Sequence, residues 1–287
     1  MTAPAVLDEP GWRARAAEHR QRVERWTLPH RDRKRRREPH PVLDFLFTYY
    51  SLRPHRLERW HPGPDVLLRG GDEYLTTPGY VRDGDAVRLD RHALPERIPA
   101  TAAFVRALLI ATEGRKPRLG CFGLHEWAMV YRADAPRHDA VPLRLGSAAT
   151  DAVVESMPVQ CTHHDAYRFF TPQARPLNTF TPTREAQIAH EQPGCLHATM
   201  DLYKWAYKLL PLTPGDLLAD CFQLAVDVRE LDMRASPYDL TTHGYPPVPI
   251  ETAAGRAEYA RSQAAFTIRA APLRERLIQL CTAVLDG

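Results

Sequence analysis

The stretch that decides the fold runs from Thr181 to Asp239 and reads TPTREAQIAHEQPGCLHATMDLYKWAYKLLPLTPGDLLADCFQLAVDVRELDMRASPYD. Proline and glycine at 193–194 and 214–215 divide it into three segments with helical features, because these residues interrupt helices. We expect the first helix to begin at Pro182, where proline suits the first helical position. Short links keep consecutive helices adjacent, so this stretch is predicted to form the helical core.

The last of these segments has two distinct faces. Its apolar residues recur at alternating spacings of four and three: Leu217, Cys221, Leu224, Val228 and Leu231. Its polar residues repeat the same rhythm one step away: Asp216, Asp220, Gln223, Asp227, Glu230 and Arg234. This row is either a solvated helix face or a set of carboxylates buried against His197 and Asp201. Buried carboxylates are tolerated only when paired or coordinated, so the second interpretation would indicate a metal or acid/base site.

The rest of the chain predicts an α+β fold that is predominantly helical, with a small antiparallel sheet. Its 287 residues, 44% hydrophobic and 25% charged, are ordinary for a globular protein with a proper core. Residues 66–89 contain short β-prone runs around Asp83-Gly84, a typical hairpin turn. Two further strands are expected at 141–146 and 152–161. We expect a basic helical N-terminal arm at 1–40 and a single compact α+β domain at 41–287.

Two basic segments are candidate phosphate contacts. Residues 31–38 hold six basic and two acidic side chains, and residues 53–61 combine arginines with Trp60. Such charge favours a polyanion such as DNA, although a solvated helix surface and a core position for Trp60 explain the same patterns. The candidate arginines are Arg33, Arg35, Arg36, Arg37, Arg56 and Arg59.

Other features bear on where the protein works. No apolar run is long enough for a membrane span and the N-terminus lacks the layout of a secretory signal, so we expect a cytoplasmic protein without a membrane partner. The five cysteines are dispersed and form no C-x-x-C pair. This pattern indicates reduced thiols and not a disulfide framework or a cysteine-built zinc site.

The sequence THHDAYRFF places His163, His164 and Asp165 directly after a predicted strand. His197 and Asp201 lie one helical turn apart in the predicted core. Imidazole and carboxylate groups are the ligands that iron, manganese and zinc share. These five residues therefore form a candidate metal shell.

The sequence GLHEWAMVYR places Glu126 and Trp127 in an apolar run. Desolvation there would raise the pKa of the Glu126 carboxyl group, as general acids require. An ion pair with Arg132, or a charge at a helix N-terminus, explains the same residue structurally.

Four segments, HPVLDFLFTYYS, GLHEWAMVYR, CTHHDAYRFFTP and EQPGCLHATMDLYKWAYKL, occur in this order. In them the chain resembles, over nearly its full length, a group of actinobacterial proteins commonly labelled 3-methyladenine DNA glycosylase. The resemblance implies an enzyme that removes alkylated purine bases from DNA. The flipped base would stack on Trp127, Trp60 or Tyr203, and Glu126 or Asp201 would stabilise the positive charge that develops on the sugar.

Two other functions remain open. The first is a metal-dependent oxygenase or hydrolase that acts on a small molecule through His163, His164, Asp165, His197 and Asp201. The second is a non-catalytic protein that binds a small ligand or nucleic acid. Salt-sensitive DNA affinity would favour the glycosylase, and stoichiometric iron, manganese or zinc would favour the metalloenzyme.

Overall fold

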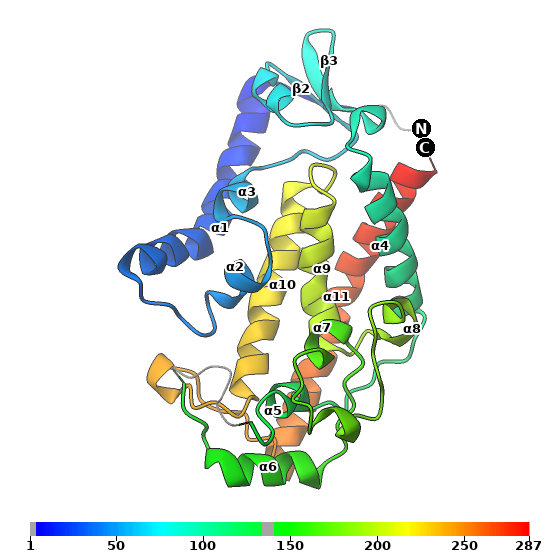
Figure 1. Cartoon of the computed structure of the whole chain (residues 1–287). Helices are drawn as coiled ribbons and strands as arrows, with labels where there is room; N and C mark the ends of the chain where they lie inside the picture. The colour runs from blue at the N-terminus through cyan, green and yellow to red at the C-terminus, as the bar shows by residue number, and fades with distance from the viewer. Residues whose placement is uncertain (1–3, 134–140, 287) are drawn as a thin grey trace. The chain divides into compact units, whose positions relative to one another are not determined.

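The computed structural model describes residues 4–133 and 141–286, which fold into eleven α-helices and four short strands (Figure 1). This confirms the predominantly helical α+β class. The helices are α1 Glu9–Arg36, α2 Phe45–Tyr49, α3 Pro54–Glu58, α4 Arg97–Glu113, α5 Leu124–Ala128, α6 Gly146–Ser156, α7 His164–Tyr167, α8 Gln187–His190, α9 Leu196–Lys208, α10 Gly215–Arg234 and α11 Ala253–Leu285. The strands are β1 Ala5–Leu7, β2 Val66–Arg69, β3 Tyr80–Asp83 and β4 Ala86–Leu89. Among these helices, none combines the length and apolar character needed to cross a membrane.

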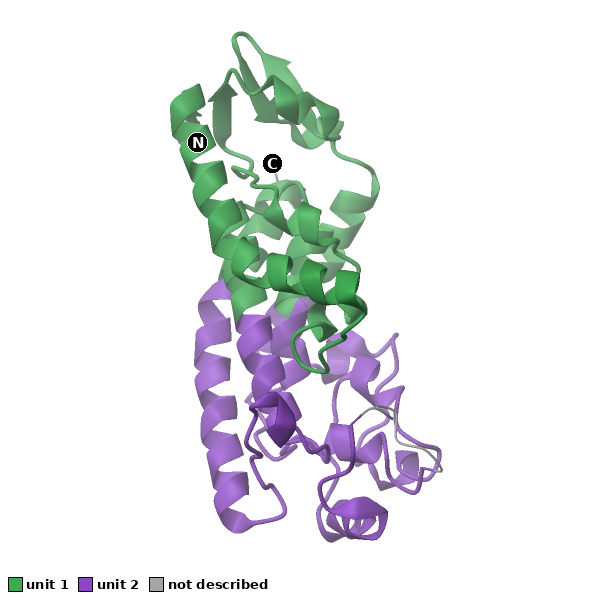
Figure 2. Cartoon of the chain, turned by 90° about the vertical axis from the view of Figure 1, so that its left-hand side faces the viewer, with its two compact units in different colours: residues 1–106, 202–223, 275–287 green, residues 107–201, 224–274 purple. Residues whose placement is uncertain are grey.

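The chain forms two compact units, which Figure 2 distinguishes by colour. Unit 1 comprises residues 1–106, 202–223 and 275–287, and unit 2 comprises 107–201 and 224–274. The sequence suggested a division between residues 40 and 41 instead. The N-terminal helix belongs to unit 1 together with distant parts of the chain, because the long helices α4, α9, α10 and α11 each contribute residues to both units.

In unit 1 the sheet has the strand order β1-β2-β4-β3. Strands β3 and β4 form the predicted hairpin, with Asp83 opposite Ala86, and Gly84 has the positive φ of 61° that the tight turn requires. β2 is antiparallel to β4, whereas β1 pairs with β2 in parallel. The sheet is therefore mixed, and not purely antiparallel as expected.

Helix α1 occupies most of the predicted N-terminal arm and includes the basic run as far as Arg36. Asp8 caps its first turn by accepting a hydrogen bond from the Gly11 N–H at 2.9 Å. The helix packs on the sheet and on α3: Trp12 donates to the Arg69 carbonyl at 2.9 Å, and His19 Nε2 lies 2.8 Å from the Leu57 carbonyl oxygen. The basic residues thus occupy the last turns of a docked helix.

The apolar stripe predicted for α10 is buried at Leu217, Cys221, Leu224, Val228 and Leu231. The acidic row one step away lies on a more accessible face. Asp216 and Asp220 pair with Arg276 at 2.5 and 3.2 Å, and Asp227 pairs with Arg269 at 2.5 Å. Of the two interpretations, the structure therefore supports the solvated helix face for this row.

Unit 2 contains the largest departure from the predicted secondary structure. Residues 146–156 form helix α6, and only the isolated bridges of Leu143 with Tyr238 and of Val159 with Asn178 remain of the two expected strands. The side chains of Thr150, Val153 and Val154 are buried on one helical face, and this packing overrides the β-preference of valine. The helix expected from Pro182 is reduced to the single turn of α8.

Candidate metal centre

Six buried side chains gather inside unit 2, namely those of His125, His163, Glu191, His197, Asp201 and Asp232, each between 0% and 7% exposed. They form two groups: His163 with Glu191 and Asp201, and His125 with His197 and Asp232. Within each group the candidate ligand atoms all lie within 4.8 Å of one another. Both groups combine imidazole nitrogen with carboxylate oxygen, the donor set of zinc, iron and manganese sites.

In the first group a single nitrogen faces two carboxylates. His163 Nε2 lies 3.3 Å from Glu191 Oε1 and 3.3 Å from Asp201 Oδ2. These separations exceed the usual length of a charge-assisted hydrogen bond. Metal–ligand bonds of about 2.0–2.2 Å at tetrahedral angles place neighbouring donor atoms about 3.3–3.5 Å apart. The nitrogen is thus separated from each carboxylate oxygen by the distance expected between two ligands of one metal ion.

In the second group one contact is shorter. His125 Nε2 lies 2.8 Å from Asp232 Oδ1, and the ring of His197 meets that of His125 edge to face at 4.5 Å. Burial opposes the charge on His125, but Asp232 outweighs it and raises the pKa of His125 well above its usual value. Burial, and then the nearby His125, lower the pKa of His197, which stays neutral as a metal ligand must be.

The two groups are neighbours. The rings of His163 and His197 stack at 5.3 Å with an interplanar angle of 28°. Helix α9 links the groups directly, since it carries His197 and, one turn later, Asp201.

Arg229 contacts Asp232 of the second group through the carboxylate oxygen that does not face His125. Its Nη1 atom lies 2.9 Å from Glu126 Oε1 and 2.8 Å from Asp232 Oδ2. Burial raises the pKa of Asp232, but His125, His197 and Arg229 outweigh it and hold this pKa below its usual range. Asp232 is therefore ionised and oriented on both of its oxygens.

Local backbone geometry lets α5 approach the end of α10. Gly123, at the start of α5, has a φ of 74°, and a β-carbon there would lie 3.4 Å from the Ala235 side chain. Trp127 lies on the same short helix and donates from Nε1 to the Ala235 carbonyl at 2.8 Å. These contacts place His125 beside Asp232.

A narrow cavity borders the second group. His125 and His197 line it, together with the thiols of Cys121, Cys161 and Cys195. All five cysteines are free, and their dispersed positions do not indicate that three of them share one cavity. Burial raises the pKa of the Cys161 and Cys195 thiols, so both remain protonated near neutral pH.

Of the five residues predicted as a metal shell, the structure brings together His163, His197 and Asp201. It directs the other two elsewhere: His164 Nδ1 lies 3.3 Å from the Pro182 carbonyl oxygen, and Asp165 pairs with Arg168 at 3.4 Å. The chain turns into helix α7 at this point, and successive helical residues point about 100° apart.

The candidate residues for base excision lie in other surroundings. Glu126 pairs with Arg229, whereas Arg132 pairs with Glu155. Trp127 and Tyr203 are fully buried in the packed interior, with no exposed surface.

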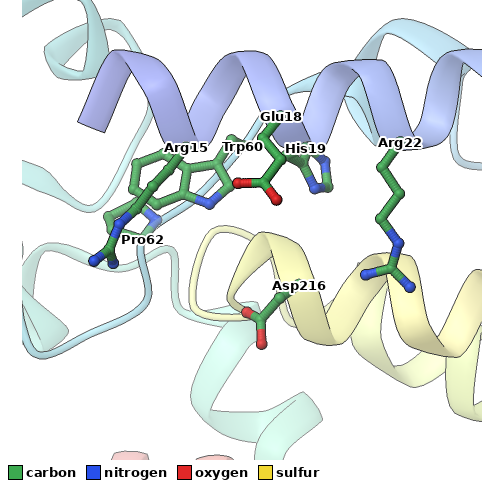
Figure 3. Close-up of a pocket in the computed structure, with 7 residues that line it drawn as sticks. All are labelled: Arg15, Glu18, His19, Arg22, Trp60, Pro62 and Asp216. Carbon is green, nitrogen blue, oxygen red and sulfur yellow. The ribbon is translucent and has the colours of Figure 1, made fainter. Parts of the chain in front are cut away.

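Trp60 lines an open hollow of about 320 Å³ in unit 1, shown in Figure 3. Arg15 and Arg22 of α1 and Asp216 of α10 border the same hollow.

The candidate phosphate-binding arginines divide into two sets. Arg33 pairs with Asp44 at 2.6 Å, Arg35 pairs with Asp32 at 3.0 Å, and Arg59 donates to the Glu73 carbonyl at 3.3 Å. The side chains of Arg36, Arg37 and Arg56 are exposed.

Sequence reasoning missed three members of the cluster, His125, Glu191 and Asp232. His125 directly precedes Glu126 in an apolar run without a second ligand at helical spacing, and Asp232 falls outside the regular acidic row of α10. Glu191 lies six residues before His197, across the 193–194 break, a spacing without diagnostic value. Comparison of the chain with models of protein families, with curated proteins and with solved structures gave no match.

Proposed function

We propose that this chain is a metal-dependent enzyme that holds a divalent cation between His163, Glu191 and Asp201 and acts on a small molecule. The observation that carries the proposal is the position of His163 Nε2, 3.3 Å from one oxygen of each carboxylate. All three residues are about 1% exposed. Carboxylates removed this completely from water need a compensating charge.

The buried charges of unit 2 support the same proposal. Four carboxylates, those of Glu126, Glu191, Asp201 and Asp232, are at most 4% exposed. Arg229 pairs with two of them, and the buried Arg274 lies near Glu113 and Glu191. The four carboxylates and two arginines carry two net negative charges, of which a protonated His125 offsets one. A buried negative excess remains in either case, and a divalent cation would compensate it.

The chemistry of the ligand atoms limits which cation the site would select. One imidazole nitrogen and two carboxylate oxygens suit zinc, manganese or iron(II), whereas calcium and magnesium favour sites made of oxygen alone. A cation of this kind polarises a bound carbonyl or phosphoryl group, or lowers the pKa of a bound water. Its chemistry would be hydrolysis, or oxygenation if the cation is iron.

Base excision receives less support from the same residues. A glycosylase needs an accessible aromatic face for the flipped base and a carboxylate directed at the sugar. Trp127 and Tyr203 are buried, and Glu126 is engaged by Arg229. Asp201 belongs to the buried cluster. These positions favour the metalloenzyme.

Elemental analysis of the untagged protein tests this proposal, with His163→Ala and His164→Ala as a matched pair. The two histidines are adjacent, but only the first faces the carboxylates. We expect bound zinc, manganese or iron in the wild type and in His164→Ala, and one equivalent less in His163→Ala. Metal-free wild-type protein that also takes up none of these cations on titration would refute the proposal.

A further inference from the structure

We propose a second cation position, formed by His125, His197 and Asp232. This position opens on the cavity, and its cation binds a ligand that enters from there. This inference rests on the proposed function, because it makes the centre dinuclear. Two histidines and one carboxylate form the facial set that holds non-haem iron(II) and leaves positions open for substrate. The three candidate ligand atoms lie within 4.8 Å of one another.

A hydrogen bond from Arg229 already orients the carboxylate of this position. Asp232 presents Oδ1 to His125, while its Oδ2 receives the Arg229 hydrogen bond at 2.8 Å. Carboxylates that bind a metal through one oxygen usually accept a hydrogen bond on the other, which fixes their orientation. Binding of a cation between His125 Nε2 and Asp232 Oδ1 would widen their 2.8 Å contact by about 0.5 Å, to the spacing of ligands in a coordination shell.

The cavity distinguishes the two positions. His125 and His197 line it, whereas His163, Glu191 and Asp201 of the first position do not. Gln160 and Thr162 supply polar groups on the same wall. A ligand that enters through this cavity therefore reaches the second cation, while the first stays enclosed by protein. The second cation would then contact the ligand directly, and the first would share in the chemistry proposed above as the neighbouring ion of the same centre.

The net charge of the buried groups indicates which kind of ligand would bind in the cavity. The four buried carboxylates and two arginines of the cluster carry two net negative charges, and two divalent cations would change this to two net positive charges. An anion would then be favoured at the open position, because a buried excess charge is costly. The cavity, of about 10 Å³, restricts this anion to the size of a water molecule, such as hydroxide.

Titration of the metal-free protein with cobalt(II), followed by its visible absorption, measures both positions. We expect two equivalents in the wild type, one in His125→Ala and one in His163→Ala. Fluoride, which is close to hydroxide in size, should shift the spectrum of the wild type and of His163→Ala, but not that of His125→Ala. His164→Ala is the matched control, because His164 adjoins His163 but its Nδ1 atom lies 3.3 Å from the Pro182 carbonyl oxygen and the residue belongs to neither ligand group. It should keep two equivalents.

The outcomes separate this inference from the proposed function. One equivalent in the wild type, lost in His163→Ala and kept in His125→Ala, would overturn the second position and leave the first intact. No binding in the wild type would refute both. Manganese(II)-loaded wild-type protein tests the inference without any variant, so the result does not depend on whether the variants fold. Two adjacent manganese ions give an exchange-coupled electron paramagnetic resonance spectrum. An uncoupled spectrum of a single ion at saturating manganese would overturn it.

Discussion

The Nε2 atom of His125 lies 2.8 Å from the Oδ1 atom of Asp232, although 107 positions of sequence separate the two residues. Arg229 extends this contact to Glu126, the neighbour of His125, at 2.9 Å. The contacts link α5 and the end of α10 into a network in which every residue is at most 4% exposed. Buried networks of this kind contribute strongly only while every member is satisfied.

Replacement of Arg229 by methionine should therefore destabilise the protein strongly. It leaves the carboxylates of Glu126 and Asp232 buried without their shared cation. We expect a loss of about 3–5 kcal/mol in the free energy of unfolding, measured by urea denaturation. Arg269→Met is the matched control, because Arg269 and its partner Asp227 are 48% and 32% exposed. Its expected loss is below about 1 kcal/mol. Equal losses in the two variants would contradict the network.

Asp44 should make the free energy of unfolding depend on pH. Burial opposes its ionisation, but Arg33, His30 and the His40 N–H group outweigh this and lower its pKa to about 2. The unfolded state binds the proton first as the pH falls, so the carboxylate stabilises the fold above about pH 4 and loses this effect as the pH falls through about 2. After allowance for its partial exposure, we expect a contribution of about 1–2 kcal/mol at neutral pH.

Denaturant titrations of wild type and Asp44→Asn at several pH values test this dependence. The wild type should be more stable at pH 7, and the difference should shrink steadily between about pH 4 and pH 2. A difference that stays constant over this range would show that the ionised carboxylate is not its source.

Gly255, in the first turn of α11, should not tolerate a side chain. A β-carbon at this position would lie 2.0 Å from the Pro249 carbonyl oxygen, a backbone atom that a side-chain rotation cannot remove. We expect Gly255→Ala to lower the free energy of unfolding by about 1–3 kcal/mol or more. In Gly114→Ala the nearest atom would be 3.6 Å away, so that change should stay within about 0.5 kcal/mol. Equal stability of the two variants would contradict the close approach.

Metal removal should lower thermal stability if the proposed centre is occupied. A cation that binds only the folded state adds stability in proportion to the logarithm of its concentration over its dissociation constant, about 4 kcal/mol at a thousandfold excess. We expect chelation to lower the melting temperature of the wild type and of His164→Ala by several degrees. His163→Ala, which lacks the first position, should show a smaller decrease on chelation. A wild type unaffected by complete removal of its metal would contradict this linkage.

Several features were predictable because they depend on neighbouring residues. The periodicity of α10 predicted its buried stripe, and Asp83-Gly84 predicted the β3–β4 hairpin. The strand predicted at 152–161 was wrong over most of its length, because valine prefers strands only until packing on a helix face buries it. Local preference could not reveal which neighbours would surround these valines.

The candidate site shows the same division. Sequence alone determined that His197 and Asp201 share one face of a helix, since their spacing matches one helical turn. It also identified THHD as a polar cluster, but not which of its residues faces inward. Tertiary structure alone decided that His163 turns inward while His164 and Asp165 turn away, and that His125, Glu191 and Asp232 join them. The physical reason is range: helical spacing is fixed by the local backbone, whereas the meeting of residues as far apart as 125 and 232 depends on how whole helices pack.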